Sequence, residues 1–135
     1  AAELAPPPEG CTFLNFTASH DGIGVRPLEG LIPDEELDGL IDAVELRGGL
    51  VSRRSLPDGS QRAYELNITW FDALSGKVTL AGRTVGEMHI ARFLCSQTIP
   101  LALQGIPAIY FHSLTATRND RIAADASGHA RDINR

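Results

Sequence analysis

The sequence predicts an α/β fold in which a parallel pair of buried strands is separated by a small α+β insertion and a long helix. Two short apolar stretches, Cys11–Thr17 and Ile106–Leu114, are rich in β-branched and aromatic residues, as buried strands are. Between them, Thr84–Leu103 carries apolar residues at helical spacing. This order is typical of a βαβ unit, whose two strands lie parallel in one sheet. Two strands cannot cover both faces of a sheet, so we expect the unit to be incomplete.

The stretch before the first strand and the turn after it have distinct compositions. Residues 1–10 include three consecutive prolines and no basic residue, so we expect a flexible lead-in rather than a signal peptide. Ser19–Gly24 contains two glycines, which allow a tight turn after the strand. Polar and ionisable residues just past the carboxyl end of a strand are typical of the active sites of α/β enzymes.

The insertion is predicted to contain one helix and one hairpin. Pro33–Leu46 begins with a proline suited to the first helical position, has acidic residues in its first turn and ends before a glycine pair. Two strands, Leu50–Arg54 and Ala63–Phe71, flank the turn-forming stretch Leu56–Ser60, which predicts a hairpin. The apolar face of the helix is expected to comprise Leu37, Leu40, Ile41 and Val44.

The long helix is expected to run over Thr84–Leu103, with Pro100 kinking or ending its last turn. The polar tail Thr115–Arg135 is expected to be a loop. The predicted buried face of the helix comprises Met88, Ala91, Cys95, Ile99 and Ala102.

Composition and charge argue against several classes of function. The chain has 135 residues, a formal net charge of −5 and a pI near 5.3, which argue against nucleic acid as a partner. No apolar run approaches the roughly 20 residues that span a bilayer, so we expect no membrane partner. The histidines lack metal-ligand spacing, and we expect no metal or other cofactor. Cys11 and Cys95 are expected to be buried free thiols, which indicates a cytoplasmic protein.

One motif carries a resemblance to a known family. Phe13–Val25, which includes His20-Asp21-Gly22-Ile23-Gly24-Val25, resembles the strand-seven motif of glycoside hydrolase family 13, the α-amylase superfamily, in the wording of its sucrose phosphorylase branch. Further stretches match that branch in the same order: Leu31–Glu35, Tyr64–Asn67, Asn119-Asp120 and Arg131–Arg135. The Tyr64-Glu65 pair is most similar to the glucosylglycerate phosphorylases. Gln104–Tyr110 resembles the approach to strand eight in the superfamily generally.

The resemblance implies a partial (β/α)8 barrel, with strands seven and eight, the helix between them and a small α+β insertion. It divides the chain into a lead-in at 1–10, strand seven and a catalytic loop at 11–25, the insertion at 26–80, and the barrel helix, strand eight and following loop at 81–135. The complete fold needs eight strands and about 250 residues. The resemblance therefore implies a fragment from the C-terminal half of the barrel, without the nucleophile and the acid/base, and so inactive alone.

The resemblance also implies roles for the residues of the sugar site. Asp21 matches the third carboxylate of the family, which binds sugar hydroxyls and stabilises the oxocarbenium-like transition state. His20 matches a sugar-binding histidine, and Arg131 matches the arginine that holds the glucosyl unit. The structural alternatives are a carboxylate that stabilises a turn, a histidine facing solvent and a solvated tail arginine.

The insertion is implied to carry the acceptor side, with Tyr64, Glu65 and Arg62 as substrate-binding residues. Sucrose phosphorylases have Tyr-Gln preceded by Asp-Leu at this position, and the departure here puts sucrose in doubt. Arg53, Arg54 and Arg62 lie around the hairpin, and cationic side chains near an acceptor would suit phosphate or a glycerate carboxylate. The alternative for Arg53 and Arg54 is that they are solvated residues at the edge of the hairpin.

The function expected on these grounds is a retaining α-glucoside phosphorylase that transfers a glucosyl group between an acceptor such as glycerate and phosphate, giving glucose 1-phosphate. The partners implied are the sugar substrate and inorganic phosphate. The alternatives are a sucrose phosphorylase, an α-glucosidase, or a non-catalytic sugar-binding or interaction module. An isolated piece of a barrel would expose the flanks of its strands, so we also expect self-association.

Overall fold

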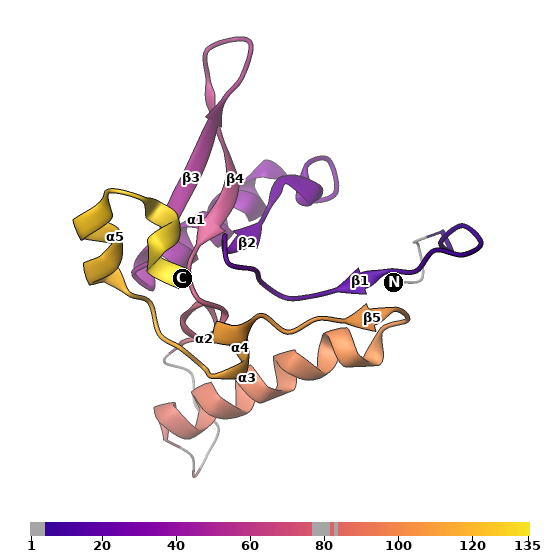
Figure 1. Cartoon of the computed structure of the whole chain (residues 1–135). Coiled ribbons are helices and arrows are strands. Elements are labelled where there is room, and N and C mark those ends of the chain that lie inside the picture. Colours follow the sequence, from indigo (N-terminus) through magenta and orange to yellow (C-terminus); the bar gives the residue numbers. More distant parts are fainter. Residues whose placement is uncertain (1–4, 77–81, 83) are drawn as a thin grey trace.

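The computed structural model of the chain describes residues 5–76, 82 and 84–135, and it has a mixed α/β architecture (Figure 1). The strands β1 (Leu14–Asn15) and β5 (Ile106–Pro107) pair in parallel. The helix α3 (Val85–Ala102) precedes β5 in the chain and runs alongside the pair. This arrangement confirms the expected parallel pairing, although each strand is much shorter than predicted.

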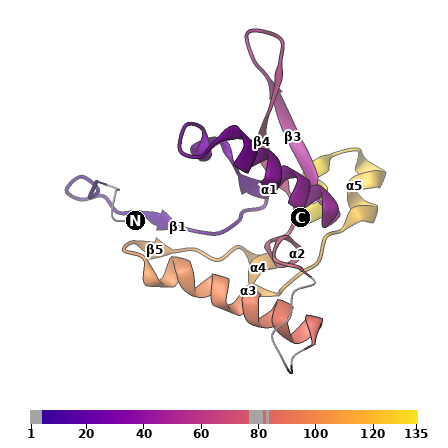
Figure 2. The same cartoon turned by 180° about the vertical axis from the view of Figure 1, so that it is seen from behind.

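A second sheet lies beside this unit and is made mostly of residues from the predicted insertion (Figures 1 and 2). Its antiparallel order is β2 (Ile23–Gly24), β4 (Gln61–Asn67) and β3 (Leu50–Ser55), and a short helix, η1 (Arg26–Leu28), follows β2. The sheet thus begins at Ile23, ahead of residue 26. The helix α1 (Asp34–Leu46) packs on it, and the buried cluster between them comprises Val25, Leu37, Ile41, Val44, Ala63, Leu66 and Ile68.

The helix and hairpin of the insertion follow the local signals in the sequence. Pro33 is the N-cap of α1 rather than its first helical residue. The predicted apolar face is buried except at Leu40, which is 44% exposed. In the hairpin turn the Leu56 N–H donates to the Ser60 carbonyl over 2.9 Å, and the Asp58 carboxylate accepts from the Ser60 N–H over 2.9 Å. Local capping and turn residues therefore determine where α1 begins and where the hairpin turns.

The expected extension of the hairpin strand to Phe71 is wrong, because a helix begins there instead. The strand β4 ends at Asn67, and α2 (Trp70–Ala73) follows. The Thr69 hydroxyl accepts a hydrogen bond from the Asp72 N–H over 3.3 Å, which caps the new helix. In the same way, the strand expected over Ile106–Leu114 ends at Pro107 and is followed by the helix α4 (Phe111–Leu114).

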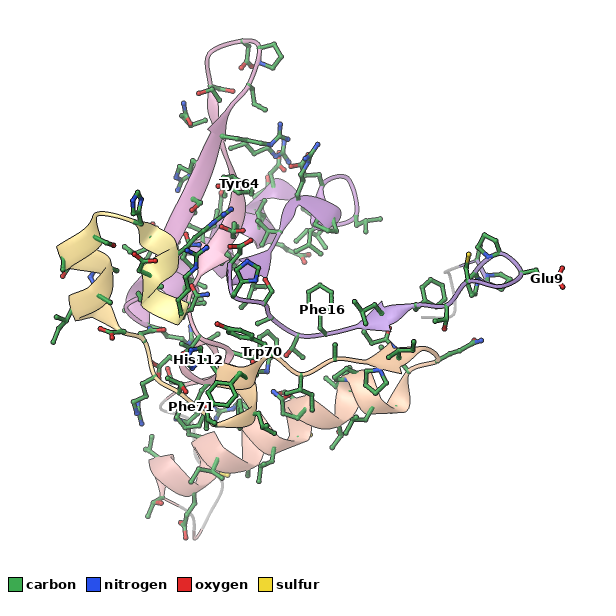
Figure 3. The ribbon with its side chains drawn as sticks, in the orientation of Figure 1. Glu9, Phe16, Tyr64, Trp70, Phe71 and His112 are labelled. Carbon is green, nitrogen blue, oxygen red and sulfur yellow. The ribbon has the colours of Figure 1, made fainter. Side chains whose placement is uncertain are left out.

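The predicted buried face of α3 is wrong, because α2 packs on a neighbouring stripe of the helix (Figure 3). His89 Nε2 lies 2.7 Å from the Phe71 carbonyl oxygen, and the two rings stack 4.0 Å apart. The Trp70 indole donates to Ser96 Oγ over 2.8 Å. The buried stripe comprises His89, Phe93, Ser96 and Pro100, whereas Cys95, Ile99 and Ala102 are exposed. Cys95 and Cys11 are free, as expected, but both are exposed rather than buried.

The tail expected to be a loop contains two further helices. The helix α5 (Arg121–Ser127) is capped by the Asp120 carboxylate, which accepts from the Ala123 N–H over 2.8 Å. It ends at Gly128, whose φ of +72° is left-handed. The helix η2 (Ala130–Asn134) then packs against β3 and β4. The Asp120 N–H donates to the Ile133 carbonyl over 2.8 Å, which closes the two helices into one unit.

The β1–β5 pair and its flanking helix expose much of their apolar surface, so the expectation of two buried strands is wrong for this chain. Leu14 and Ile106 are both more than half exposed, because no segment within the described ranges covers them. The helices of the described part include none with the length and apolarity to cross a membrane. The assignment of β1 and β5 to particular barrel strands, and the self-association of the chain, stay predictions. The large exposed apolar side chains of this region are Leu14, Phe16, Val85, Ile90, Leu94, Ile99, Leu101, Leu103, Ile106, Ile109, Phe111 and Leu114.

Candidate functional site

A tight turn between β1 and β2 presents the histidine and the aspartate of the motif. Ser19 and Gly22 exchange two backbone hydrogen bonds of 3.0 Å each. Gly22 has a φ of +114°, and a Cβ atom there would collide with the Leu66 carbonyl oxygen of β4. The Asp21 N–H donates to Ser19 Oγ over 3.2 Å. The turn therefore needs glycine at position 22, and it holds Asp21 against the second sheet.

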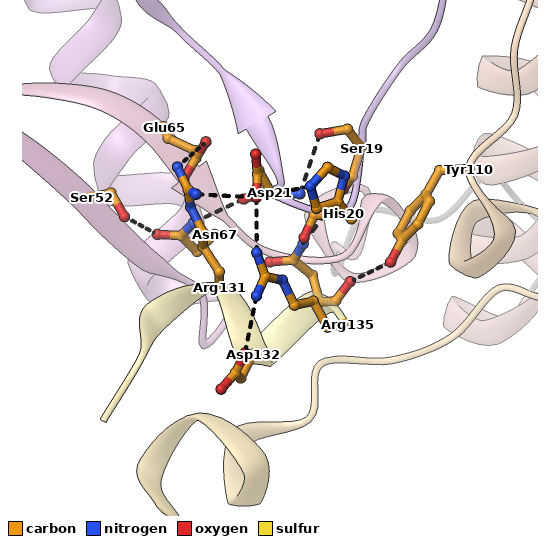
Figure 4. Close-up of polar contacts among 11 residues, drawn as sticks. Ser19, His20, Asp21, Ser52, Glu65, Asn67, Tyr110, Arg131, Asp132 and Arg135 are labelled. Carbon is orange, nitrogen blue, oxygen red and sulfur yellow. Dashed lines mark hydrogen bonds and ion pairs between the residues drawn. The ribbon is translucent and has the colours of Figure 1, made fainter. Parts of the chain in front are cut away.

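Three side chains converge on one oxygen of the Asp21 carboxylate (Figure 4). Arg135 Nη2 lies 3.1 Å from Asp21 Oδ1, and Arg131 Nη1 lies 3.3 Å from the same atom. His20 Nε2 also lies 3.3 Å from this oxygen. The Asp21 side chain is 28% exposed, so solvent still reaches this group. Two guanidinium groups and an imidazole thus surround a carboxylate that a ligand could approach.

A second carboxylate, that of Glu65 on β4, binds the other side of Arg131. Arg131 Nε donates to Glu65 Oε2 over 2.9 Å, and Nη2 donates to Oε1 over 3.4 Å. This two-point pairing raises the pKa of the Arg131 guanidinium, first through the hydrogen bond and then through the charge of Glu65. Glu65 is only 8% exposed.

Two buried asparagines fix the backbone around the carboxylates. Asn67, which is fully buried, donates from Nδ2 to the Asp21 carbonyl over 2.9 Å and to Glu65 Oε2 over 3.1 Å. Its Oδ1 accepts from Ser52 Oγ over 2.7 Å. From η2, Asn134 donates to the His20 carbonyl over 2.8 Å. Strand β4 and helix η2 therefore clamp the Asp21 turn from two sides.

Tyr110 closes the cluster on the side of the β1–β5 pair. Its hydroxyl donates to the Asn134 carbonyl over 3.2 Å. Burial raises the pKa of the Tyr110 hydroxyl, and the nearby charge of Asp21 raises it further against the opposing effect of Arg135. The neutral hydroxyl is therefore favoured, and it can keep donating to the carbonyl at neutral pH.

The structure brings four of the residues singled out in the sequence together and leaves two apart. Asp21, His20, Arg131 and Glu65 form the cluster. Tyr64 is half-buried on β4 next to Glu65, and its carbonyl accepts from the Val25 N–H over 3.1 Å. Arg62 lies on the side of α1, where its Nη2 is 2.8 Å from Asp34 Oδ1 and its Nε is 3.9 Å from Glu29 Oε1. Tyr64 is thus a neighbour of the cluster along the strand, whereas Arg62 pairs with acidic groups away from it.

Reasoning from the sequence did not single out several members of the cluster as site residues. Asn67 and Arg135 stand at the ends of stretches that carry the family resemblance, and this position was a usable signal. Asn134 also lies within such a stretch, whereas Ser52 gave no signal, because its role depends on the fold placing Asn67 beside it. The members found only in the structure are Ser52, Asn67, Tyr110, Asn134 and Arg135.

A hollow of about 410 Å³ opens beside the arginines and offers room for a small polar ligand. Its lining residues are Ser52, Gly128, His129, Ala130, Arg131 and Arg135. Within residues 5–76, 82 and 84–135, no group of three histidine, cysteine, aspartate or glutamate side chains is placed to hold a metal ion. Donors and carboxylates beside a polar hollow suit the binding of a hydroxyl-rich or anionic molecule.

Comparison with known proteins shows which enzymes this chain resembles. The glucosylglycerate phosphorylase of Escherichia coli (strain K12) is 41% identical over 135 residues, which are all of this chain and 23% of that protein. The glucosylglycerate phosphorylase of Allomeiothermus silvanus is 44% identical over 135 residues, again all of this chain and 24% of that protein. This chain is a homologue of the glycoside phosphorylases. The resemblance read from the motifs is thus confirmed.

The structural comparison agrees with this similarity to the glycoside phosphorylases. A crystal structure of sucrose 6F-phosphate phosphorylase from Thermoanaerobacter thermosaccharolyticum matches 90% of this chain and 23% of that chain, with a TM-score of 0.73 and 27% sequence identity. No family model matches the chain. The chain spans about a quarter of the length of the curated relatives it matches.

Proposed function

We propose that the Asp21 cluster is the glucosyl-binding part of a retaining phosphorylase that transfers a glucosyl group between glycerate and phosphate, giving glucose 1-phosphate. The observation that carries this proposal is the partly exposed Asp21 carboxylate, which a tight turn places within 3.3 Å of Arg131, Arg135 and His20. The glycerate acceptor is supported by the higher identity to the glucosylglycerate phosphorylases, 41 to 44%, than to the sucrose and sucrose 6F-phosphate phosphorylases, 27 to 33%.

In this proposal Asp21 stabilises the transition state of glucosyl transfer. Positive charge develops on the sugar ring as the glycosidic bond breaks, and a carboxylate held in place beside the ring lowers the barrier. His20 and Arg131 would donate hydrogen bonds to the sugar hydroxyls. Their distances of 3.3 Å to Asp21 Oδ1 are long for charge-assisted bonds, so a bound hydroxyl could displace either one at little cost.

The remaining chemistry would come from outside this chain. Retention needs a nucleophile and a proton donor about 5 Å apart. By resemblance, both lie on earlier strands of a (β/α)8 barrel in which β1 and β5 would be strands seven and eight. We therefore propose that the 135 residues alone do not turn over substrate. The free thiols of Cys11 and Cys95 favour a cytoplasmic location.

The acceptor side is proposed to include Tyr64 and Arg62. Tyr64 is half-buried beside Glu65, so its ring can still meet a ligand. Arg62 would first have to leave its ion pairs with Asp34 and Glu29 before it could bind a phosphate or a glycerate carboxylate. Both ion pairs are partly exposed, and pairs of this kind are worth at most about 1 kcal/mol.

The test is the substitution Asp21→Asn in an intact enzyme, made by exchanging the matching segment of the E. coli relative for this chain. The substitution keeps the shape of the side chain but removes its charge, so kcat for phosphate release from glucose 1-phosphate with glycerate should fall by about 10² to 10³. The control is Asp42→Asn, a change at an exposed position of α1. An Asp21→Asn enzyme as fast as the control would contradict the proposal.

A further inference from the structure

The carboxylate of Glu65 accepts three hydrogen bonds from the protein itself. Its Oε2 accepts from Arg131 Nε over 2.9 Å and from Asn67 Nδ2 over 3.1 Å, while Oε1 accepts from Arg131 Nη2 over 3.4 Å. The side chain of Glu65 is only 10% exposed. A group this buried and this occupied offers little to a ligand, so contact with an acceptor does not explain its presence.

The guanidinium of Arg131 joins the two carboxylates. Two of its nitrogens, Nε and Nη2, face Glu65, and the third, Nη1, lies 3.3 Å from Asp21 Oδ1. A guanidinium is a rigid plane, so fixing one edge of it on a carboxylate also fixes the direction of the remaining nitrogen. The Arg131 side chain is 38% exposed, and without Glu65 it would be free to turn toward solvent.

Glu65 is itself held firmly enough to act as a support. It lies in β4, and the fully buried Asn67 two residues later binds both its carboxylate and the Asp21 carbonyl. Ser52 on the neighbouring strand β3 donates to Asn67 Oδ1 over 2.7 Å. A continuous chain of hydrogen bonds and ion pairs therefore runs from β3 through Asn67, Glu65 and Arg131 to Asp21 (Figure 4).

We infer that Glu65 is a positioning residue that holds Arg131 on the glucosyl side of the site and does not contact the acceptor. The inference rests on the proposed function of the Asp21 cluster. Glu65 and Arg131 then act as one unit, so that the loss of either side chain slows the same step, the transfer of the glucosyl group. This loss of rate should not depend on which acceptor takes the glucosyl group.

The test compares two acceptors in the intact enzyme described above, which carries this chain. With Glu65→Gln, the transfer of glucose from glucose 1-phosphate to glycerate and its transfer to water should both fall by the same factor, about 10- to 100-fold, since a misplaced binding group disturbs glucosyl transfer itself. The KM for glycerate should change little. Slower transfer to glycerate with unchanged hydrolysis would place Glu65 at the acceptor and overturn the inference.

A double substitution sharpens the test. If Glu65 acts only through Arg131, the enzyme with Glu65→Gln and Arg131→Lys should be no slower than the one with Arg131→Lys alone. If the two substitutions instead reduced the rate by factors that multiply, the inference would be overturned. The matched control is Glu45→Gln, the same change at an exposed position of α1. If Glu65→Gln does not fold, Glu65→Asp replaces it, because it keeps the charge but shortens the reach, and the same pattern is expected.

A measurement without turnover separates this inference from the proposed function. If the unmutated enzyme were inactive on every substrate, the proposed function would be contradicted. The inference about Glu65 would then be tested by proton exchange instead. In protein labelled with ¹⁵N-arginine, the Arg131 Nε–H should exchange with water at least about tenfold faster after Glu65→Gln, because the hydrogen bond that protects it is lost. Unchanged exchange would overturn the positioning role.

Discussion

At the scale of single residues, the site depends on a turn that only glycine can complete. Gly22 has a φ of +114°, and a Cβ atom there would lie 3.1 Å from the Leu66 carbonyl carbon and closer still to its oxygen. The neighbouring Asp21 would have to move with the turn, and its contacts with Arg131 and Arg135 would move with it. The position of the Asp21 carboxylate is therefore set by a backbone requirement next to it.

Gly22→Ala should therefore destabilise the fold by about 2 kcal/mol or more, through backbone strain and the clash with β4. Thermal unfolding measures the change. Gly24→Ala is the matched control, since Gly24 has no atom within 4 Å of its added Cβ, and this change should stay within about 0.5 kcal/mol. Equal stability of the two variants would show that the turn is not constrained as described.

The sequence predicted single residues well where a motif carried them. Asp21, His20 and Arg131 were found because their stretches resemble a known family, and the structure brings them together. Ser52 could not be found in this way, since it lies outside those stretches and acts through a hydrogen bond to Asn67, which is distant along the chain. Glu65 and Arg131 were both singled out, but their pairing was not, because pairing across 66 positions is a property of the fold.

At the scale of elements, local signals decide which helices and turns form, and tertiary contacts decide which faces are buried. The predictions for α1 and the hairpin turn follow from capping and turn residues, and both elements form. The buried stripe of α3 could not be predicted, because it is set by α2, which was itself read as the end of a strand. The capping signals at Thr69 and Asp120 were present in the sequence and would have indicated α2 and α5.

The docking of α2 against the segment before α5 gives a prediction at this scale. The buried Asp72 carboxylate accepts from the Asn119 N–H over 2.7 Å and from Arg118 Nη1 over 3.2 Å. Asp72→Ala should cost about 1 to 3 kcal/mol of unfolding free energy, because it leaves the N–H without its partner. Urea unfolding measures this cost.

Asp125→Ala is the control for that substitution. It removes an exposed pair with Arg121 on α5 and should cost less than about 1 kcal/mol. A cost for Asp72→Ala as small as that of the control would show that the segment after α4 is held in place by other contacts.

At the scale of the whole molecule, the cluster lies where two parts of the fold meet. Figure 1 shows the β1–β5 pair with α3 on one side and the three-stranded sheet with α1 and η2 on the other. Asp21 comes from the connection between them, Glu65 from the sheet and Arg131 from η2. The exposed apolar side chains of the first part lie around β1, β5 and α3, and the polar cluster is separate from them. The order of β1, α1, the hairpin, α3 and β5 was predicted from the sequence, whereas α2, α4, α5, η2 and the juxtaposition of β4 with η2 were not.

The central proposal is that the Asp21 cluster binds the glucosyl group in a phosphorylase whose acceptor is glycerate, with Tyr64 and Arg62 on the acceptor side. The most direct measurement is phosphate-dependent release of glucose 1-phosphate by the intact enzyme carrying this chain, with glucosylglycerate and sucrose compared side by side. We expect release from glucosylglycerate and none from sucrose. Release from sucrose, or from neither substrate, would contradict the claim.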